Sequence, residues 1–280
     1  MRITFMGTAA SEGLPGAFCQ CRDCMEARKL GGRELRSRSQ ILVNEDLLVD
    51  MGPETYWKSV LYGIELSRVK YLFVTHSHSD HLDEKLLGFR GGWFGKEMVE
   101  PVLKAYGNEQ AVEKMAKRLS DCAFDFVKEA TVCHVIHEFD RVQAGEYEVT
   151  ALPAVHSPDE ECLLYLIRDE KGNSFLYATD TGRLTEETYE YLKGRRLDCV
   201  IMDCTLGNKP DVGISHMGLK ENLVIKERLM KLGVTDQNTR FLCTHISHGT
   251  GGYEYLSGEA KKLGIEVAYD GMQVEWGCGR

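Results

Sequence analysis

The chain of 280 residues has no long hydrophobic run, and this excludes a membrane-spanning helix. Its longest apolar runs, such as residues 162–167, cover about six residues, whereas a helix needs about 20 to cross a bilayer. Residues 1–7 alternate like a strand and lack the apolar stretch of a signal peptide. We therefore expect a soluble, cytoplasmic protein without a membrane partner.

Compositional bias is also missing. The chain has 28 glycines and 6 prolines, and its 43% hydrophobic and 28% charged residues are close to globular averages, which excludes a disordered or fibrous protein. No proline- or serine-rich linker divides the sequence. We expect one domain over residues 1–280, and a homodimer is one arrangement that the sequence allows.

Positive charge is in deficit, with 34 lysines and arginines against 43 acidic residues and a net charge of −9. Such a chain repels a long phosphate backbone, so we expect no extended nucleic-acid partner. One local basic stretch consists of Arg28, Lys29, Arg33, Arg36 and Arg38. Most such runs are solvated, and the alternative is a rim that steers phosphate toward a binding site.

Short apolar runs alternate with amphipathic stretches, as in an α/β protein. Strands are predicted at residues 3–6, 39–43, 47–49, 69–74, 102–105, 131–136, 147–152, 162–167, 175–178, 199–202, 241–243 and 267–269. Helices are predicted at 53–62, 108–119, 185–192, 219–232 and 253–263, with Gly233 and Gly264 where helix ends should be. This order predicts two mixed β-sheets packed together with helices outside.

The most informative segment is a histidine-rich motif at the end of the predicted strand 69–74. It reads His76-Ser77-His78-Ser79-Asp80-His81. At a strand end, His76 and His78 can project to one side, while Asp80 and His81 project to an adjacent side as the chain turns. A loop of this kind can serve two metal ions about 3.5–4 Å apart.

This motif resembles the signature of the metallo-β-lactamase superfamily. Residues 48–52, Leu-Val-Asp-Met-Gly, are similar to that family's first motif, and His156, Asp180 and His245 follow strand-like segments in the family's order. The resemblance extends over nearly the whole chain. It implies an α/β fold of the αββα sandwich type and a metal-dependent hydrolase.

The resemblance also implies how two active-site metals are bound. It assigns His76, His78 and His156 to one metal, Asp80, His81 and His245 to the other, and Asp180 as the bridge between them. Neutral imidazoles suit Zn²⁺, Mn²⁺ or Fe²⁺, and carboxylates offset the charge of two dications. We expect Asp50 to support the site rather than bind a metal.

Three of the ten cysteines, Cys19, Cys21 and Cys24, are closely spaced as Cys-x-Cys-x-x-Cys, which is typical of metal ligands. Tetrahedral zinc needs a fourth ligand, and His248 is left over once His245 joins the active site. We expect a structural Cys₃His zinc site. An iron-sulfur or redox-active set, or merely reduced cysteines, are the alternatives.

The other cysteines lie mostly in apolar runs and are expected to be reduced core residues: Cys122, Cys133, Cys162, Cys199, Cys204, Cys243 and Cys278.

The proposed zinc site resembles that of one subset of the superfamily, the phosphoribosyl 1,2-cyclic phosphodiesterases of phosphonate breakdown. A related group in quinone-cofactor biosynthesis also has a cysteine cluster, but its members depart from the His-x-His-x-Asp-His pattern that is intact here. The comparison favours a catalytic enzyme.

His216 precedes a helical stretch and matches the extra histidine that phosphodiesterases of this superfamily place near the substrate. Its implied role is to contact the phosphate or protonate the leaving oxygen, and a capping or surface role is the alternative. His134 and His137 are expected to be core or edge residues without a function.

We therefore expect a binuclear phosphodiesterase for small, cyclic phosphodiesters, in which a metal-bridging hydroxide attacks phosphorus and His216 or Asp80 assists the leaving group. Asp80 is the weaker candidate acid because it is also an expected metal ligand. A nuclease of the same superfamily and a thioester or lactone hydrolase are the alternatives. The sequence has no basic stripe with interleaved aromatics, which argues against the nuclease.

Overall fold

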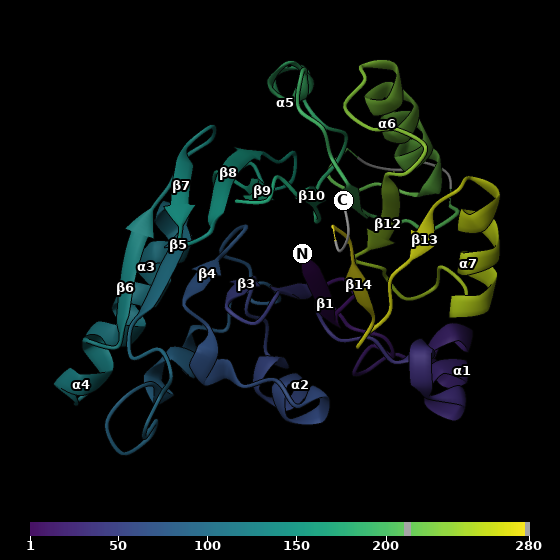
Figure 1. Ribbon diagram of the computed structural model, residues 1–280. Coiled ribbons are helices and arrows are strands. Elements are labelled where there is room, and N and C mark those ends of the chain that lie inside the picture. Colours follow the sequence, from purple (N-terminus) through teal and green to yellow (C-terminus); the bar gives the residue numbers. More distant parts are fainter. Residues whose placement is uncertain (210–213, 278–280) are drawn as a thin grey trace.

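The computed structural model describes residues 1–209 and 214–277. These residues form two mixed sheets of seven strands with helices on the outer faces, so the predicted αββα sandwich is confirmed (Figure 1). The helices of this part of the chain are all too short or too polar to cross a bilayer.

The first sheet has the strand order β14-β1-β2-β3-β4-β5-β6. Its strands are β1 (Arg2–Gly7), β2 (Gln40–Val43), β3 (Leu47–Val49), β4 (Tyr71–Phe73), β5 (Leu103–Gly107), β6 (Thr131–Val135) and β14 (Gln273–Glu275). The pairs from β3 to β6 are parallel and the others are antiparallel.

The second sheet has the order β13-β12-β11-β10-β9-β8-β7. Its strands are β7 (Arg141–Ala144), β8 (Tyr147–Pro153), β9 (Leu163–Asp169), β10 (Ser174–Ala178), β11 (Cys199–Asp203), β12 (Arg240–Thr244) and β13 (Glu266–Val267). The pairs from β10 to β13 are parallel, and the pairs from β7 to β10 are antiparallel.

Helices cover both outer faces. They are α1 (Arg22–Leu30), α2 (Thr55–Tyr62), α3 (Glu109–Ser120), α4 (Asp125–Lys128), α5 (Glu186–Leu192), α6 (Leu219–Lys231) and α7 (Tyr253–Lys262). Short 3₁₀ helices cover Gly32–Glu34, Leu66–Arg68 and Glu84–Phe89. In Figure 1, α1 lies beside α7, so an early and a late segment of the sequence meet on one side of the sandwich.

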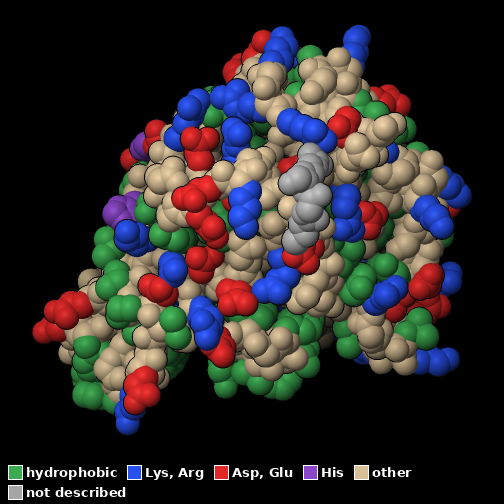
Figure 2. All heavy atoms as spheres, in the orientation of Figure 1, with side chains coloured by type: hydrophobic (Ala, Val, Ile, Leu, Met, Phe, Trp, Pro, Cys, Tyr) green, Lys and Arg blue, Asp and Glu red, His purple; other side chains and the backbone are tan. Residues whose placement is uncertain are grey.

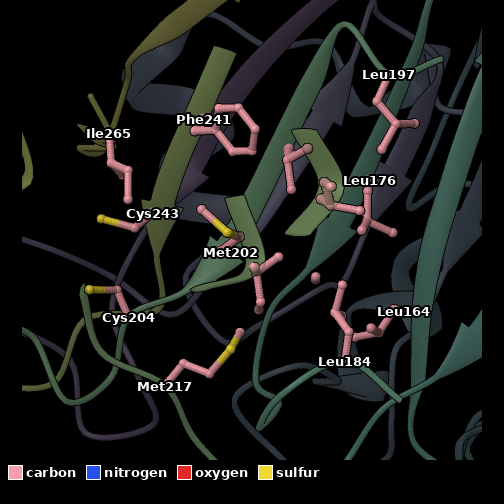
Figure 3. Packing of buried hydrophobic residues seen from close by; sticks show 14 of the residues in the cluster. Leu164, Leu176, Leu184, Leu197, Met202, Cys204, Met217, Phe241, Cys243 and Ile265 are labelled. Atoms are coloured by element: carbon pink, nitrogen blue, oxygen red, sulfur yellow. The ribbon is translucent and has the colours of Figure 1, made fainter. Parts of the chain in front are cut away.

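Alternation along the strands divides the core into layers. On β12, Leu242 packs between the sheets, while Phe241 and Cys243 face the outer layer under the helices. Figure 3 shows this outer layer, in which the side chains of Met202 and Phe241 lie together. Buried apolar side chains cover both faces of each sheet, so the strand ends are held at fixed positions.

The cysteines outside the closely spaced triplet behave largely as expected. Four of them are buried, namely Cys162, Cys199, Cys204 and Cys243, and the two half-buried ones are Cys122 and Cys133. None of the described cysteines takes part in a disulfide, and Cys278 lies outside the described residues.

Candidate metal centre

Six strand ends bring polar side chains to one edge of the sandwich. Strands β3, β4 and β8 end at or just before Asp50, the loop 75–81 and His156, respectively. Strands β10, β11 and β12 end at or just before Asp180, Asp203 and His245, respectively. Within each sheet these strands run in the same direction, because β8 and β10 are both antiparallel to β9. Parallel strands present their carboxyl ends at a common edge, so distant segments of the sequence meet there.

Three of these residues have left-handed backbone conformations: φ is 63° at Asp50, 51° at Asp180 and 58° at His245. Residues other than glycine adopt this region rarely, and such strain clusters at functional sites. Each of the three residues lies within two positions of the end of its strand, where the chain leaves the sheet.

The first group of candidate ligands consists of His76, His78, His156 and Asp180, with one ligand atom of each within 4.8 Å of the others. His76 Nε2 lies 2.9 Å from His78 Nδ1 and 3.3 Å from Asp180 Oδ2. His156 Nε2 lies 3.2 Å from the same His78 atom. Nitrogens that share a tetrahedral zinc are about 3.3 Å apart, so this spacing suits one cation.

The second group consists of Asp80, His81, Asp180 and His245. His81 Nε2 lies 3.2 Å from Asp80 Oδ2 and 3.1 Å from Asp180 Oδ2. His245 Nε2 lies 3.6 Å from Asp180 Oδ2 and 3.9 Å from Asp80 Oδ2. Asp180 therefore belongs to both groups, which is the position that a bridging ligand requires.

Asp50 holds His81 from behind. Its Oδ2 lies 2.7 Å from His81 Nδ1, and its Oδ1 accepts hydrogen bonds from the amide and hydroxyl of Thr75. Both Asp50 and His81 are fully buried. A carboxylate in this place fixes the proton on Nδ1 and leaves Nε2 free to bind a metal.

Asp203 plays a similar part on the other side, and the sequence analysis did not identify it. Its Oδ2 lies 3.3 Å from His245 Nδ1 and 3.6 Å from His216 Nδ1, and the side chain is fully buried. It also accepts hydrogen bonds from Thr205 and from the amide of Met217. The only signal in the sequence was its place at the end of the predicted strand 199–202.

Glu160 was also missed. Its carboxylate accepts hydrogen bonds from the amide and hydroxyl of Ser77 at 2.8 and 3.0 Å, and from the side-chain amide of Asn108 at 2.8 Å. It lies 3.9 Å from His78 Nε2. Glu160 thus ties the histidine loop to a segment 83 residues away, and no local sequence pattern indicates such a contact.

Several buried polar atoms at this edge have no hydrogen-bond partner among the described residues. They include His81 Nε2, His245 Nε2 and Asp180 Oδ1. Unpartnered buried polar atoms are unfavourable, and these three converge on the interior of the two groups. Imidazole and carboxylate donors in this arrangement fit two divalent cations of the Zn²⁺ or Mn²⁺ type.

The charge of Asp180 fits the same interpretation. Burial alone would raise the pKa of this carboxyl, but the facing imidazoles, His245 first, outweigh it and hold the pKa well below its ordinary value. A buried anionic oxygen among imidazoles is the electrostatic setting in which a cation binds.

His216 lies at the rim of the centre. Its Nδ1 is 3.3 Å from Asp180 Oδ1, and its side chain is 29% exposed. Gly182 allows this approach, because a Cβ at Gly182 would lie 1.7 Å from the carbonyl oxygen of Ile214. His216 is therefore not a distant surface residue, and its ring borders the space between the metal groups and solvent.

The cysteine triplet and His248 lie close together in space. His248 Nδ1 lies 3.2, 3.5 and 3.4 Å from the sulfurs of Cys19, Cys21 and Cys24. A tetrahedral zinc with Zn–S of about 2.3 Å and Zn–N of about 2.0 Å separates sulfur and nitrogen by about 3.5 Å, so the four residues fit zinc. A hydrogen bond from the amide of Cys24, aided by His248, lowers the pKa of the Cys21 thiol to about 6.

The basic stretch is not a single solvated face. Arg28 donates hydrogen bonds to the carbonyls of Cys19 and Gly16 and so braces the cysteine loop. Arg36 is buried and donates to Thr8 and to a backbone carbonyl. These contacts also do not match the second interpretation, a continuous rim that steers phosphate toward the site.

The remaining arginines have separate partners, since Arg38 pairs with Glu54 and Arg33 lies over the ring of Tyr269.

Two histidines lie outside the candidate metal groups. His134 belongs to the edge strand β6 and stacks on Tyr106 of β5, and His137 pairs with Glu161 at the surface. His134 thus lies at an edge of the first sheet, whereas His137 lies in the exposed loop after β6 rather than in the core or an edge strand.

The comparisons with known proteins agree with this geometry. The model of the β-lactamase superfamily domain matches residues 46–246. Coenzyme PQQ synthesis protein B of Acinetobacter baylyi is 23% identical over 98% of this chain and 100% of its own length. Ribonuclease Z of Methanothermobacter thermautotrophicus is 27% identical over 63% of this chain and 50% of its own length.

Among solved structures, a diphosphatase of the PhnP family is similar in fold. It has a TM-score of 0.72 and 22% identity, and the alignment covers 99% of this chain and 98% of that one. The family match spans the first histidine motif, Asp180 and His245, and therefore most of the candidate centre. The chain belongs to the β-lactamase superfamily and is a metal-dependent hydrolase with the metallo-β-lactamase fold.

Proposed function

We propose that this chain hydrolyses small phosphodiesters, cyclic ones included, at a centre of two divalent metal ions. The observation that carries the proposal is the shared position of Asp180 between two groups of ligands, with His216 beside the same carboxylate. An anionic substrate needs no basic surface here, because two cations would hold it. This accords with the net charge of −9.

In the proposed complex, His76, His78 and His156 hold one metal, Asp80, His81 and His245 hold the other, and Asp180 is shared. Two bound cations would make a water nucleophilic at neutral pH and offset the charge that develops on phosphate. The carboxylates of Asp50 and Asp203 fix the orientation of His81 and His245.

We assign proton transfer to His216. Its Nδ1 faces Asp203 and Asp180, so the opposite ring nitrogen, Nε2, is left to contact phosphate or to protonate the leaving oxygen. Asp80 is buried with its Oδ2 toward His81 and His245, and this supports a role as ligand rather than acid. The proposed division is therefore Asp80 for metal binding and His216 for the leaving group.

A nuclease is the second candidate, because the similarity to ribonuclease Z covers 63% of this chain. The negative charge of the chain weighs against binding a long RNA. The similarity to coenzyme PQQ synthesis protein B covers 98% of this chain, but the intact His-x-His-x-Asp-His motif supports hydrolysis. A thioester or lactone hydrolase could use the same metal ligands, and His216 argues for phosphodiesters instead.

A substrate panel tests the proposal. Purified enzyme is assayed with Zn²⁺ and with Mn²⁺ on bis(p-nitrophenyl) phosphate, 2′,3′-cyclic nucleotides, a phosphoribosyl cyclic phosphate, a lactone, a thioester and pre-tRNA. We expect the highest kcat/KM on a small phosphodiester. Preference for pre-tRNA would favour the nuclease, and preference for the lactone or thioester would reject phosphodiester chemistry.

A further inference from the structure

Helix α2 is oriented with its apolar side outward. Four of its side chains are more than half exposed, and we call them the α2 ridge: Tyr56, Trp57, Val60 and Leu61. Its buried side carries polar residues, among them Lys58 and Ser59. A surface helix normally turns its apolar stripe to the core, so this orientation needs a reason.

A buried ion pair fixes the orientation. Lys58 Nζ lies 2.7 Å from Asp270 Oδ2, and the two side chains are 11% and 4% exposed. Asp270 also accepts hydrogen bonds from Thr8 and Ser37. Rolling α2 to bury its ridge would break this pair and leave a buried charge unpaired, which is strongly unfavourable. The ridge therefore stays at the surface of the single chain.

A second apolar prominence lies near the ridge. It consists of aromatic rings in mutual contact, and we call it the aromatic knob: Phe89, Trp93, Phe94, Phe124 and Phe126. Phe89, Trp93 and Phe94 are 56%, 59% and 46% exposed. Figure 2 shows apolar side chains gathered along the lower edge of the molecule, over α2 and separately toward α4.

An apolar hollow of about 320 Å³ adjoins the start of α2 and the aromatic knob. Thr55 at the start of α2 lines it together with Phe94 and Met98. The buried side chains of Leu72 and Leu87 line it as well. One face of the chain thus carries both a ridge and a hollow.

The apolar area is large for an uncovered surface. Aromatic side chains can bury about 150–250 Å² each, so the five most exposed rings of the ridge and knob present roughly 500 Å² at half exposure. Val60, Leu61 and neighbouring exposed residues such as Val102 add to this area. Together the two prominences approach the ~800 Å² per partner of a standard interface.

We propose that this face is the interface of a twofold homodimer, in which the α2 ridge of each copy packs into the hollow of the other. In a twofold interface the same patch serves both partners, so it must be complementary to itself. A face that carries both a ridge and a hollow meets this requirement.

A membrane surface fits less well. Binding to anionic lipid requires a rim of lysines and arginines around the apolar patch. Here the rim of the hollow has Lys96, while Arg90 is engaged by the backbone carbonyls of Ala130 and Glu100. The acidic residues Glu97 and Glu100 lie on the same segment.

Sedimentation velocity of the metal-loaded full chain tests the proposal over a wide range of concentrations. We expect a species of twice the 31.6 kDa chain mass for the unmodified protein. Trp57→Glu and Leu61→Glu should each shift it to the mass of one chain. The matched control is Val224→Glu on α6, which is also about half exposed, at 49%, and should remain a dimer.

Circular dichroism and thermal unfolding of each variant show whether it is folded. A folded Trp57→Glu and a folded Leu61→Glu that both remain dimeric would overturn the proposed interface. A single-chain mass for the unmodified protein at every concentration would reject the dimer. Cosedimentation of a monomeric chain with phosphatidylglycerol vesicles would identify the face as a membrane surface instead.

Discussion

At the scale of single residues, the centre depends on side chains that are each held from two sides. His81 is fixed by Asp50 behind it and faces Asp80 and Asp180 in front. His245 is held in the same way by Asp203. Such outer carboxylates set the tautomer and the angle of a ligand, and they lower the entropy that is lost when a metal binds.

The first prediction concerns this support. Asp50→Asn preserves the shape, but its amide nitrogen would face His81 Nδ1 and favour the proton on Nε2, the atom that must bind the metal. We expect the affinity for one active-site metal to fall about 10–100-fold. Competition with a chelator measures it, with the exposed Asp125→Asn as control. Equal affinities of the two variants would refute the role of Asp50.

The second prediction concerns His216. His216→Ala should leave both metals bound and slow the hydrolysis of phosphodiesters by about 10²–10⁴-fold, the range for the loss of a general acid. The loss should be smaller with p-nitrophenolate, which leaves without a proton, than with the alkoxide of a ribose cyclic phosphate. Steady-state kinetics on both substrates measures it, with the exposed His137→Ala as control.

Equal losses on both substrates would make His216 a phosphate contact rather than an acid. No loss on either would remove His216 from the mechanism and weaken the proposed phosphodiesterase activity.

At the scale of elements, the cysteine loop and α1 are tied to the C-terminal part of the chain. Asp23 on α1 accepts a hydrogen bond from the amide of Gly251, and Glu12 accepts from Ser247 and from the amide of His248. The bridges of Ala9 to Ile246 continue this seam to the residue after His245. The proposed zinc would close the seam.

The third prediction follows from this seam. Cys21→Ser should remove about one zinc per chain and lower the melting temperature, because a structural zinc couples metal binding to folding. The remaining folded enzyme should keep some turnover. Elemental analysis and thermal unfolding measure it, with the half-buried Cys122→Ser as control. Unchanged zinc in both Cys21→Ser and His248→Ala would show that the assignment is wrong.

The sequence predicted most elements because their periodicity is strong. The strands of the second sheet that bury both faces, such as β11, appear as short continuous apolar runs. The edge strands β7 and β14 were missed, since Arg141, Gln143 and Gln273 break any apolar run there. Helix α1 was missed as well, because it buries only Cys24 and Ala27.

The candidate ligands were accessible to sequence reasoning because they form a motif or stand at strand ends. Asp203 and Glu160 were not, since each acts through contacts between distant segments. Glu160 meets Ser77 across 83 residues, and no local pattern records such a contact. The outward orientation of α2 could not be predicted from the sequence either. The helical period indicates that the helix has an apolar stripe, but not which surface covers that stripe.

At the scale of the whole molecule, the sandwich brings the ends of strands from two sheets to one edge. The two groups of ligands share Asp180, whose backbone is strained and whose side chain is 3% exposed. The apolar face over α2 is a separate surface, so assembly and catalysis should respond to different substitutions. Trp57→Glu should therefore change the mass of the particle while the metal content per chain stays the same.

Whether two metals share Asp180 is tested directly by the metal content and turnover of Asp180→Ala. Loss of the shared ligand should lower the active-site metal content and the turnover together, while the zinc at the cysteine site stays bound. The exposed Asp121→Ala is the matched control. Elemental analysis per chain, combined with kcat on a small phosphodiester, measures both. Full activity and unchanged metal content in Asp180→Ala would contradict the binuclear centre.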